Sequence, residues 1–227
     1  MSSTTKNSKI NSRNDKAQKT SKSALIIFTR NPELGKCKTR LAATVGDESA
    51  LNIYCFLLDH TVAITSPLTV DKFVFYSEAL RKEDRWDTSI FRKKTQKGDD
   101  LGQRMHNAFV EIFELGYEQA IIIGSDMYDL SSEELALAFT ELNTHDFVVG
   151  PAKDGGYYLL GMTQPNEALF QNKKWGSDTV LEATMTNLKD QNYKLLAEKN
   201  DIDYFEDVKD IAALQQFLPA HLDNNFL

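Results

Sequence analysis

A short polar loop near the N-terminus concentrates positive charge. Gly35 lets the backbone approach a ligand closely, and Lys36, Lys38 and Arg40 place three cations within five residues. An arginine can pair with a phosphate through two hydrogen bonds and a lysine acts as a point charge, so the loop suits a di- or triphosphate. It is not a Walker A loop, because Arg30 stands where that motif has its first glycine. A solvated basic turn is the alternative interpretation.

Carboxylates that follow an apolar run form the second group. Asp126 and Asp129 come after the run 119–124 (QAIIIG), and carboxylate oxygens are ligands that Mg²⁺ and Mn²⁺ prefer. The alternatives are an Asx-turn for Asp126, where we favour the metal, and a helix-entry acid for Asp129, where we favour the helix. A second ligand could come from a late acidic cluster, although acids before a helix also stabilise its dipole. That cluster comprises Asp201, Asp203, Glu206 and Asp207.

A third group consists of a carboxylate in front of a glycine pair. Asp154 precedes Gly155 and Gly156, which leave room for a ligand at the backbone, and its carboxylate can hold sugar hydroxyls or accept a proton. A hairpin turn of the D-G type is the alternative, and both interpretations can hold together. Trp175, shortly before an expected helix, would supply an aromatic wall for a sugar ring or an acceptor. A tryptophan of the core is the alternative there.

Other kinds of site are missing from the sequence. The four histidines share no metal-ligand spacing and no G-x-S-x-G motif occurs, so the metalloprotease and serine-hydrolase motifs are excluded. Two cysteines, Cys37 and Cys55, cannot form a disulfide framework or a four-ligand zinc site. This use of cysteine fits a reducing interior, and we expect a cytoplasmic protein.

The net charge of −7 over 227 residues combines two unlike parts. Residues 1–23 hold six basic groups, one acid and nine Ser or Thr with little to bury, which predicts a disordered basic tail. Residues 24–227 carry a net charge of −12, which would repel a phosphate backbone, so we expect no nucleic-acid partner. No apolar run approaches the roughly 18 residues of a membrane span. The oligomeric state stays open.

Short apolar runs alternate with longer segments of helical period from Ala24 onward, which is typical of βαβ units. We expect an α/β domain over 24–227 with a mainly parallel sheet and helices on both faces. Its strands are expected at 24–29, 72–77, 119–124, 146–151 and 157–162. Its helices are expected at 47–65 with Asp47 as the cap, at 99–115, after a capping box of Ser131 and Glu134, at 177–191 and at 206–218. The polar groups follow strand ends, where open α/β sheets bind ligands.

Five segments together resemble a known family. They are PELGKCKTRLA (32–42), QKGDDLGQRM (96–105), IGSDMYDL (123–130), GPAKDGGYYLLG (150–161) and WGSDTVL (175–181). In this order they are similar to the bacterial glycosyltransferase-A-like transferases, relatives of phospholactate guanylyltransferase and of the molybdenum-cofactor nucleotidyltransferases. The similarity runs from about Ala24 to Leu214. Five linked motifs are far more specific than any one alone.

The resemblance implies a single Rossmann-like nucleotide-diphospho-sugar transferase domain and a divalent metal, Mg²⁺ or Mn²⁺. It implies nucleotide phosphates on Gly35, Lys36, Lys38 and Arg40, the metal on Asp126 with Asp203 as its second ligand, and the sugar or acceptor on Asp154, Gly155 and Gly156. Two positions depart from the family pattern. Tyr128 replaces a proline, which adds bulk near Asp126, and Tyr204 replaces a threonine, which removes a hydroxyl near Asp203.

The leading hypothesis is a metal-dependent transferase that moves the glycosyl group of a nucleotide-activated sugar to a small-molecule acceptor. Asp126 and Asp154 would be its catalytic residues. The alternative is nucleotidyl transfer from an NTP with release of pyrophosphate, because both reactions need a phosphate loop, a metal and an acceptor site. A third hypothesis is a noncatalytic nucleotide-binding module in which Tyr128 and Tyr204 block the metal.

Overall fold

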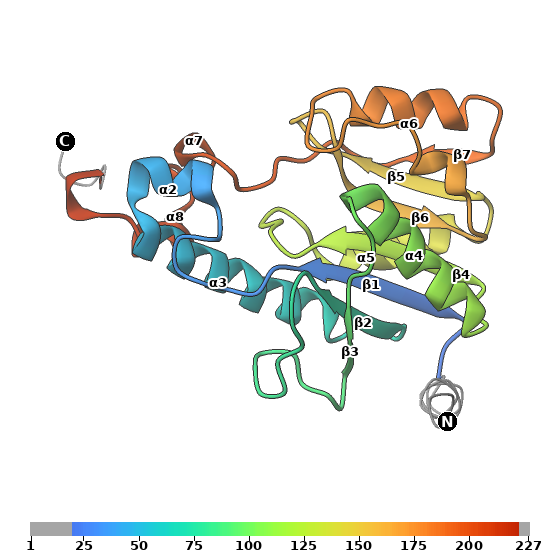
Figure 1. Ribbon diagram of the computed structural model, residues 1–227, viewed down its shortest axis with the longest axis horizontal. Coiled ribbons are helices and arrows are strands. Elements are labelled where there is room, and N and C mark those ends of the chain that lie inside the picture. The colour runs from blue at the N-terminus through green and yellow to red at the C-terminus, as the bar shows by residue number, and fades with distance from the viewer. Residues whose placement is uncertain (1–19, 223–227) are drawn as a thin grey trace, which may run out of the picture.

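The computed structural model (Figure 1) describes residues 20–222, and within this range seven strands form one mixed sheet in the order β3-β2-β1-β4-β6-β5-β7. The strands are β1 (Ser23–Thr29), β2 (Asp71–Tyr76), β3 (Phe91–Thr95), β4 (Gln119–Gly124), β5 (Phe147–Pro151), β6 (Tyr157–Met162) and β7 (Tyr193–Leu195). The helices are α2 (Thr39–Val45), α3 (Asp47–Thr65), α4 (Leu101–Glu114), α5 (Ser132–Glu141), α6 (Val180–Leu188), α7 (Phe205–Val208) and α8 (Ala212–Gln215), with single 3-10 turns at Glu167–Leu169 and Ala220–Leu222.

Helices cover both faces of the sheet, as the sequence predicts. Side chains of β1 alternate between the faces, so that Leu25 and Ile27 join one cluster and Ala24 and Ile26 join the other. The first cluster includes side chains of α3 and α5, and the second includes side chains of α4 and α6. β1 is therefore buried on both sides, which explains its continuous apolar run.

The sheet is parallel except at β6. Strands β1, β2, β3 and β4 run parallel to one another, as do β5 and β7, whereas β6 pairs antiparallel with both β4 and β5. β5 and β6 form a hairpin around Asp154 and Gly155, so the D-G turn is present. Gly155 has φ +85°, a conformation that favours glycine. Because β6 runs opposite to β4, this turn lies beside the carboxyl end of β4.

The two strands that the sequence analysis missed lie at the edges of the sheet. β3 (FRKKT) and β7 stand at opposite ends of the strand order. Edge strands are often charged, which protects them from pairing with other chains, and so they lack the apolar alternation of inner strands. In β3, Lys93 pairs with Asp84 at 2.7 Å and Lys94 pairs with Glu111 at 2.8 Å.

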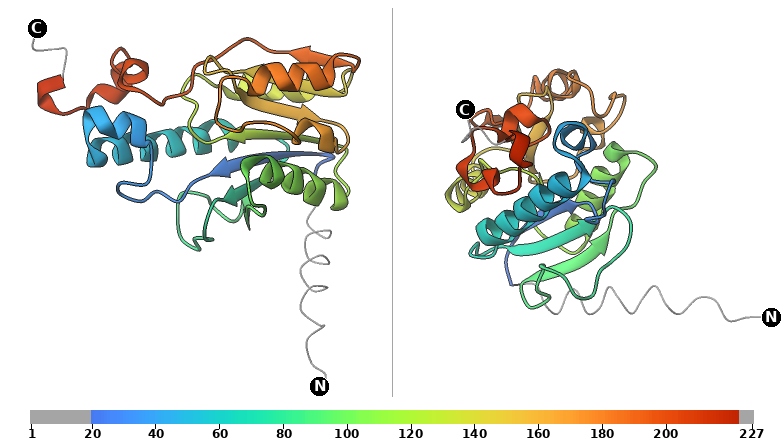
Figure 2. Two further views of the ribbon diagram at one scale, coloured as in Figure 1. Left: turned by 45° about the horizontal axis from the view of Figure 1, so that its top comes forward. Right: turned by 90° about the vertical axis from the view of Figure 1, so that its left-hand side faces the viewer.

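A third apolar cluster joins α2, α3, α7 and α8 at one end of the molecule (Figures 1 and 2). One helix over 206–218 was expected there, and this prediction is wrong, because two short helices are present. The break lets Val208 and Leu214 both face the cluster. The Gln215 side chain donates to the carbonyls of Val208, Lys209 and Ile211, which replaces helical hydrogen bonds at the break. The expected cap at Asp47 is also wrong, because Gly46 occupies the N-cap of α3.

Most of the expected basic tail lies outside the described residues. Of 1–23, only 20–23 are described, and Thr20 donates from its backbone N–H to Asp71 at 3.0 Å. Within residues 20–222, no helix is long and apolar enough to cross a membrane.

The capping box of α5 allows a test of this local structure. The Ser131 hydroxyl accepts from the Glu134 N–H at 3.2 Å, so Ser131→Ala should lower the free energy of unfolding by about 1 kcal/mol in urea denaturation. Exposed Glu133 in the same turn provides the control, and Glu133→Gln should change stability by less than about 0.5 kcal/mol. Equal stability of Ser131→Ala and the native protein would contradict the capping role.

Candidate active site

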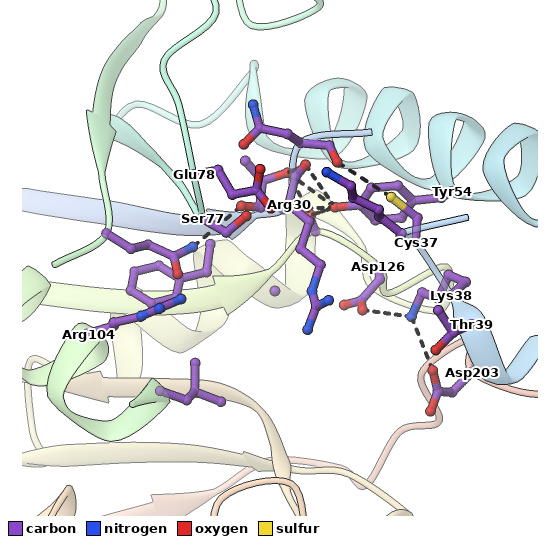
Figure 3. A pocket seen from close by; sticks show the side chains of 18 of the residues that line it. Arg30, Cys37, Lys38, Thr39, Tyr54, Ser77, Glu78, Arg104, Asp126 and Asp203 are labelled. Atoms are coloured by element: carbon purple, nitrogen blue, oxygen red, sulfur yellow. Dashed lines mark hydrogen bonds and ion pairs between the residues drawn. The ribbon is translucent and has the colours of Figure 1, made fainter. Parts of the chain in front are cut away.

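A cavity of about 750 Å³ lies at the carboxyl ends of the parallel strands β1, β2, β3 and β4 (Figure 3). The residues that follow these strands all reach it, in agreement with the position of ligand sites in open α/β sheets. The segment 36–40, which leads into α2, forms a further wall. Asp203, which follows β7 and precedes α7, contributes from the far end of the chain.

Lys38 is the centre of the charged network in this cavity. Its Nζ donates to Asp126 Oδ2 at 2.8 Å and lies 3.8 Å from Asp203 Oδ1, and its side chain is only 7% exposed. Lys38 also has φ 48° and ψ 48°, a left-handed conformation that costs a residue with a side chain about 1–2 kcal/mol. The ion pairs hold this conformation, because a buried ammonium needs its partners.

The pKa values of Lys38 and Asp126 move apart. Burial alone would lower the pKa of Lys38 and raise the pKa of Asp126, because it disfavours the charged forms. The Coulomb attraction and the hydrogen bond between the two groups outweigh burial. The pKa of Lys38 is therefore raised and the pKa of Asp126 is lowered, and both groups are charged at neutral pH.

The remaining residues of the basic loop differ in their environment. Arg40 donates to Asp203 Oδ2 and lies 5.7 Å from the ring of Tyr204, so it forms the outer wall of the cavity. Lys36 lines the cavity but pairs at the surface with Glu33, at 2.7 Å. Gly35 has φ +72° in the turn before them and does not line the cavity. Its contribution is the loop conformation.

A smaller cavity of about 190 Å³ adjoins the first, and both are lined by Leu101, Gly124 and Asp126. Three of the predicted acceptor residues line it, namely Asp154, Gly156 and Trp175. Gly155 does not, because it packs against the chain behind the turn, where a Cβ would lie 2.2 Å from the Asp178 carbonyl oxygen.

Close packing at two glycines shapes the aromatic walls of the smaller cavity. A Cβ on Gly102, in the first turn of α4, would lie 2.3 Å from Trp175 Nε1. A Cβ on Gly150 would lie 2.4 Å from the ring of Tyr158. Both glycines belong to segments of the family resemblance, and their lack of a side chain gives the rings their positions.

Several lining residues were not singled out by the sequence analysis. Arg30 directly follows β1 and points toward Asp126 in Figure 3, while Gln96 follows β3 and Arg104 lies on α4. Gln96 and Arg104 both belong to the second family segment (96–105), which was therefore the available signal for them. The strand that Gln96 follows, β3, was missed. Asp201, which belongs to the late acidic cluster that the sequence analysis named, lines the smaller cavity, where burial and then the charge of Asp126 raise its pKa to about 6.

Asp129 lies outside both cavities. Its side chain is 75% exposed and its carboxylate is 3.6 Å from Lys199 Nζ. This ion pair, together with the helix that follows, agrees with the helix-entry interpretation.

The carboxylates of the larger cavity can be tested for their fit to a metal. One ammonium, that of Lys38, contacts both Asp126 and Asp203, so the two carboxylates face a common point. Mg²⁺ often takes one or two protein carboxylates and completes its shell with waters and substrate phosphates. Residues 20–222 hold no group of three or more His, Cys, Asp or Glu that could bind a metal ion. The donor set therefore fits a metal that is completed by a nucleotide, and the two ligand roles stay predictions.

The fold defines the class of this protein as a nucleotide-diphospho-sugar transferase-type α/β domain, which confirms the resemblance of the sequence. Residues 61–177 match the model of the family DUF2064, uncharacterized protein conserved in bacteria, and the chain belongs to that family.

A solved structure from Desulfovibrio desulfuricans G20, described as a candidate nucleotide-diphospho-sugar transferase, is 27% identical with a TM-score of 0.77. The match covers 86% of this chain and 94% of that one. Two others share the fold alone. A cytidylyltransferase from Leptospira borgpetersenii is 16% identical (TM-score 0.51; 81% and 79% covered). The inositol-1-phosphate CTP transferase from T. maritima is 14% identical (TM-score 0.52; 86% and 94% covered). No curated protein matches the chain.

The dependence of Asp126 on Lys38 can be measured. In Lys38→Met the partly buried carboxylate of Asp126, whose side chain is 35% exposed, loses its cation, so the pKa of Asp126 should rise relative to the native protein in an NMR titration of ¹³C-labelled carboxyls. In the native protein the lowered pKa stabilises the fold above the unfolded-state pKa. This contribution is lost as the pH falls through the lower pKa of the folded state.

Lys36→Met is the matched control, because Lys36 is exposed and pairs with Glu33. It should leave the titration of Asp126 unchanged. An unchanged titration in Lys38→Met would show that another group holds Asp126 ionised.

Proposed function

We propose that this protein is a metal-dependent glycosyltransferase that uses a nucleotide-activated sugar to modify a small acceptor. The observation that carries the proposal is the junction of the two cavities at Asp126. The larger cavity, with its basic residues, suits the nucleotide diphosphate, and the smaller one suits the acceptor. A bond between sugar and diphosphate would then lie where the cavities meet.

The chain's own cations would bind the donor. Lys38 and Arg40 now pair with Asp126 and Asp203, and phosphate oxygens can take the place of those carboxylates. Arg30 and Arg104 line the same cavity and add positive charge. Asp126 and Asp203 would hold Mg²⁺ or Mn²⁺, which when bound supplies Lewis-acid stabilisation of the leaving diphosphate.

Asp154 would act on the acceptor. Its Oδ1 accepts from the Gly156 N–H at 2.8 Å, which orients the carboxylate at the rim of the smaller cavity. The acceptor oxygen bonds to the anomeric carbon, and its proton passes to Asp154. The bond between the anomeric carbon and the diphosphate oxygen breaks, and the nucleoside diphosphate leaves.

Nucleotidyl transfer is the second candidate, because cytidylyltransferases share the fold. In that reaction the acceptor oxygen attacks the α-phosphorus of an NTP and pyrophosphate leaves. The same cations and carboxylates would serve both reactions. The products distinguish them, since phosphorus NMR shows a nucleoside diphosphate for glycosyl transfer and pyrophosphate for nucleotidyl transfer.

A thermal-shift panel identifies the donor before turnover is attempted. A ligand that binds the folded state adds RT ln(1 + [L]/Kd) to its stability. UDP-, GDP- and dTDP-sugars and NTPs, each with and without Mg²⁺ or Mn²⁺, would reveal base, sugar and metal together. A noncatalytic module would be stabilised by the nucleotide without any dependence on the metal.

The role of Asp126 predicts a specific loss of turnover. Asp126→Asn keeps the shape of the side chain but removes its charge, so we expect a loss of about 10²-fold or more in metal-dependent turnover, with binding of the nucleotide base retained. Asp129→Asn is the matched control, because Asp129 is 75% exposed and outside both cavities. It should keep native turnover, and full activity in Asp126→Asn would remove Asp126 from the mechanism.

A further inference from the structure

The charges that line the smaller cavity all have one sign. Asp126, Asp154 and Asp201 line it, and within residues 20–222 no Lys, Arg or His does so. We propose that this cavity selects a small hydroxylated acceptor that carries no phosphate or carboxylate group. The inference rests on the proposed function, because that function makes the cavity the acceptor site.

The nearest cation does not neutralise the cavity. Lys38 pairs with Asp126 from the side of the larger cavity and accounts for one of the three charges. Within the described part of the chain, Asp154 and Asp201 have no ion-pair partner within 4.0 Å. Two carboxylates are therefore left without an ion-pair partner to face the acceptor, and an anionic group would be repelled there.

The uncharged walls favour a polyol in the same place. Tyr157, Tyr158 and Trp175 supply aromatic surface, on which the C–H groups of a polyol can pack. Carboxylates accept hydrogen bonds from hydroxyls or from a protonated amine. At about 190 Å³ the cavity is smaller than the roughly 300–1,000 Å³ of drug-sized sites, so the acceptor should be small.

This charge pattern separates the chain from a relative of the same fold. The name of the inositol-1-phosphate CTP transferase describes an acceptor that carries a phosphate. Phosphate sites in proteins are built from Arg or Lys side chains or from backbone N–H groups, and carboxylates that face the phosphate oppose its binding. The smaller cavity offers carboxylates instead. Shared fold and different acceptor chemistry are compatible, because function depends on the site.

The two tryptophans of the chain provide a direct measurement. Trp175 lines the cavity, whereas Trp86 is 2% exposed and packs against Phe91, 5.1 Å between ring centroids. In protein labelled with 5-fluorotryptophan, the Trp175 resonance reports on the cavity and Trp86 is an internal reference. The probes are three compounds built on the same three-carbon chain, namely glycerol, its amine analogue serinol, and glycerol 3-phosphate.

We expect glycerol and serinol to shift the Trp175 resonance with a Kd at least tenfold lower than that of glycerol 3-phosphate. Serinol should bind at least as tightly as glycerol, because its ammonium is attracted by the carboxylates. Binding of glycerol 3-phosphate as tight as that of glycerol would overturn the proposal. Weaker binding of serinol than of glycerol, or no response of Trp175 to any probe, would also overturn it.

Charge-neutral variants identify the source of the selectivity. The double variant Asp154→Asn with Asp201→Asn should lose most of the discrimination against glycerol 3-phosphate. Asp178→Asn, at an exposed carboxylate that lines neither cavity, is the control and should keep it. Unchanged discrimination in the double variant would contradict the role of these two carboxylates.

The binding measurement needs no donor, metal or turnover, so it fails or succeeds independently of the proposed function. A protein that binds polyols at Trp175 but never turns over a nucleotide-sugar would retain the selectivity of the cavity for uncharged hydroxylated ligands and refute the function. A protein that transfers sugar only to phosphorylated acceptors would retain the function and refute the inference.

Discussion

The buried ammonium of Lys38 constrains the whole site. Its side chain is 7% exposed, and removing a partner from a buried ion pair typically costs about 3–5 kcal/mol, so a negatively charged partner must stay beside it, and Asp126 and Asp203 fill that role in this structure. These contacts join the loop before α2 to the end of β4 and to the segment before α7. Three remote parts of the chain are thereby held at one point, and the left-handed backbone of Lys38 is held with them.

The sheet provides the second requirement of the site, which is a place where the loops after several strands converge. Parallel pairing of β1, β2, β3 and β4 brings their carboxyl ends to one edge, and the larger cavity forms there. The antiparallel strand β6 then brings the Asp154 turn to the same region. A uniformly parallel sheet would start β6 at the opposite edge. One reversed strand therefore creates the smaller cavity beside the larger one.

The two cavities differ in charge although Asp126 lines both. Lys36, Lys38, Arg40, Arg30 and Arg104 line the larger cavity, whereas the smaller one has only carboxylates among its charged lining residues within the described chain. The net charge of −7 hides this division. A phosphorylated donor and a non-anionic acceptor would each meet the charge that suits it. The same local separation would allow an acidic protein to hold the nucleotide that the proposed function requires.

The sequence by itself determined the inner strands, α3, α4 and the capping box of α5, because local periodicity and end signals specify them. It also placed the candidate residues at strand ends. Only the tertiary structure decided which charges meet: Lys38 rather than Lys36 reaches Asp126, 88 residues away, and Arg40 reaches Asp203, 163 residues away. The edge strand β3 and the split between α7 and α8 were decided at the same level. Such features depend on burial and on partners distant in sequence, which no local pattern records.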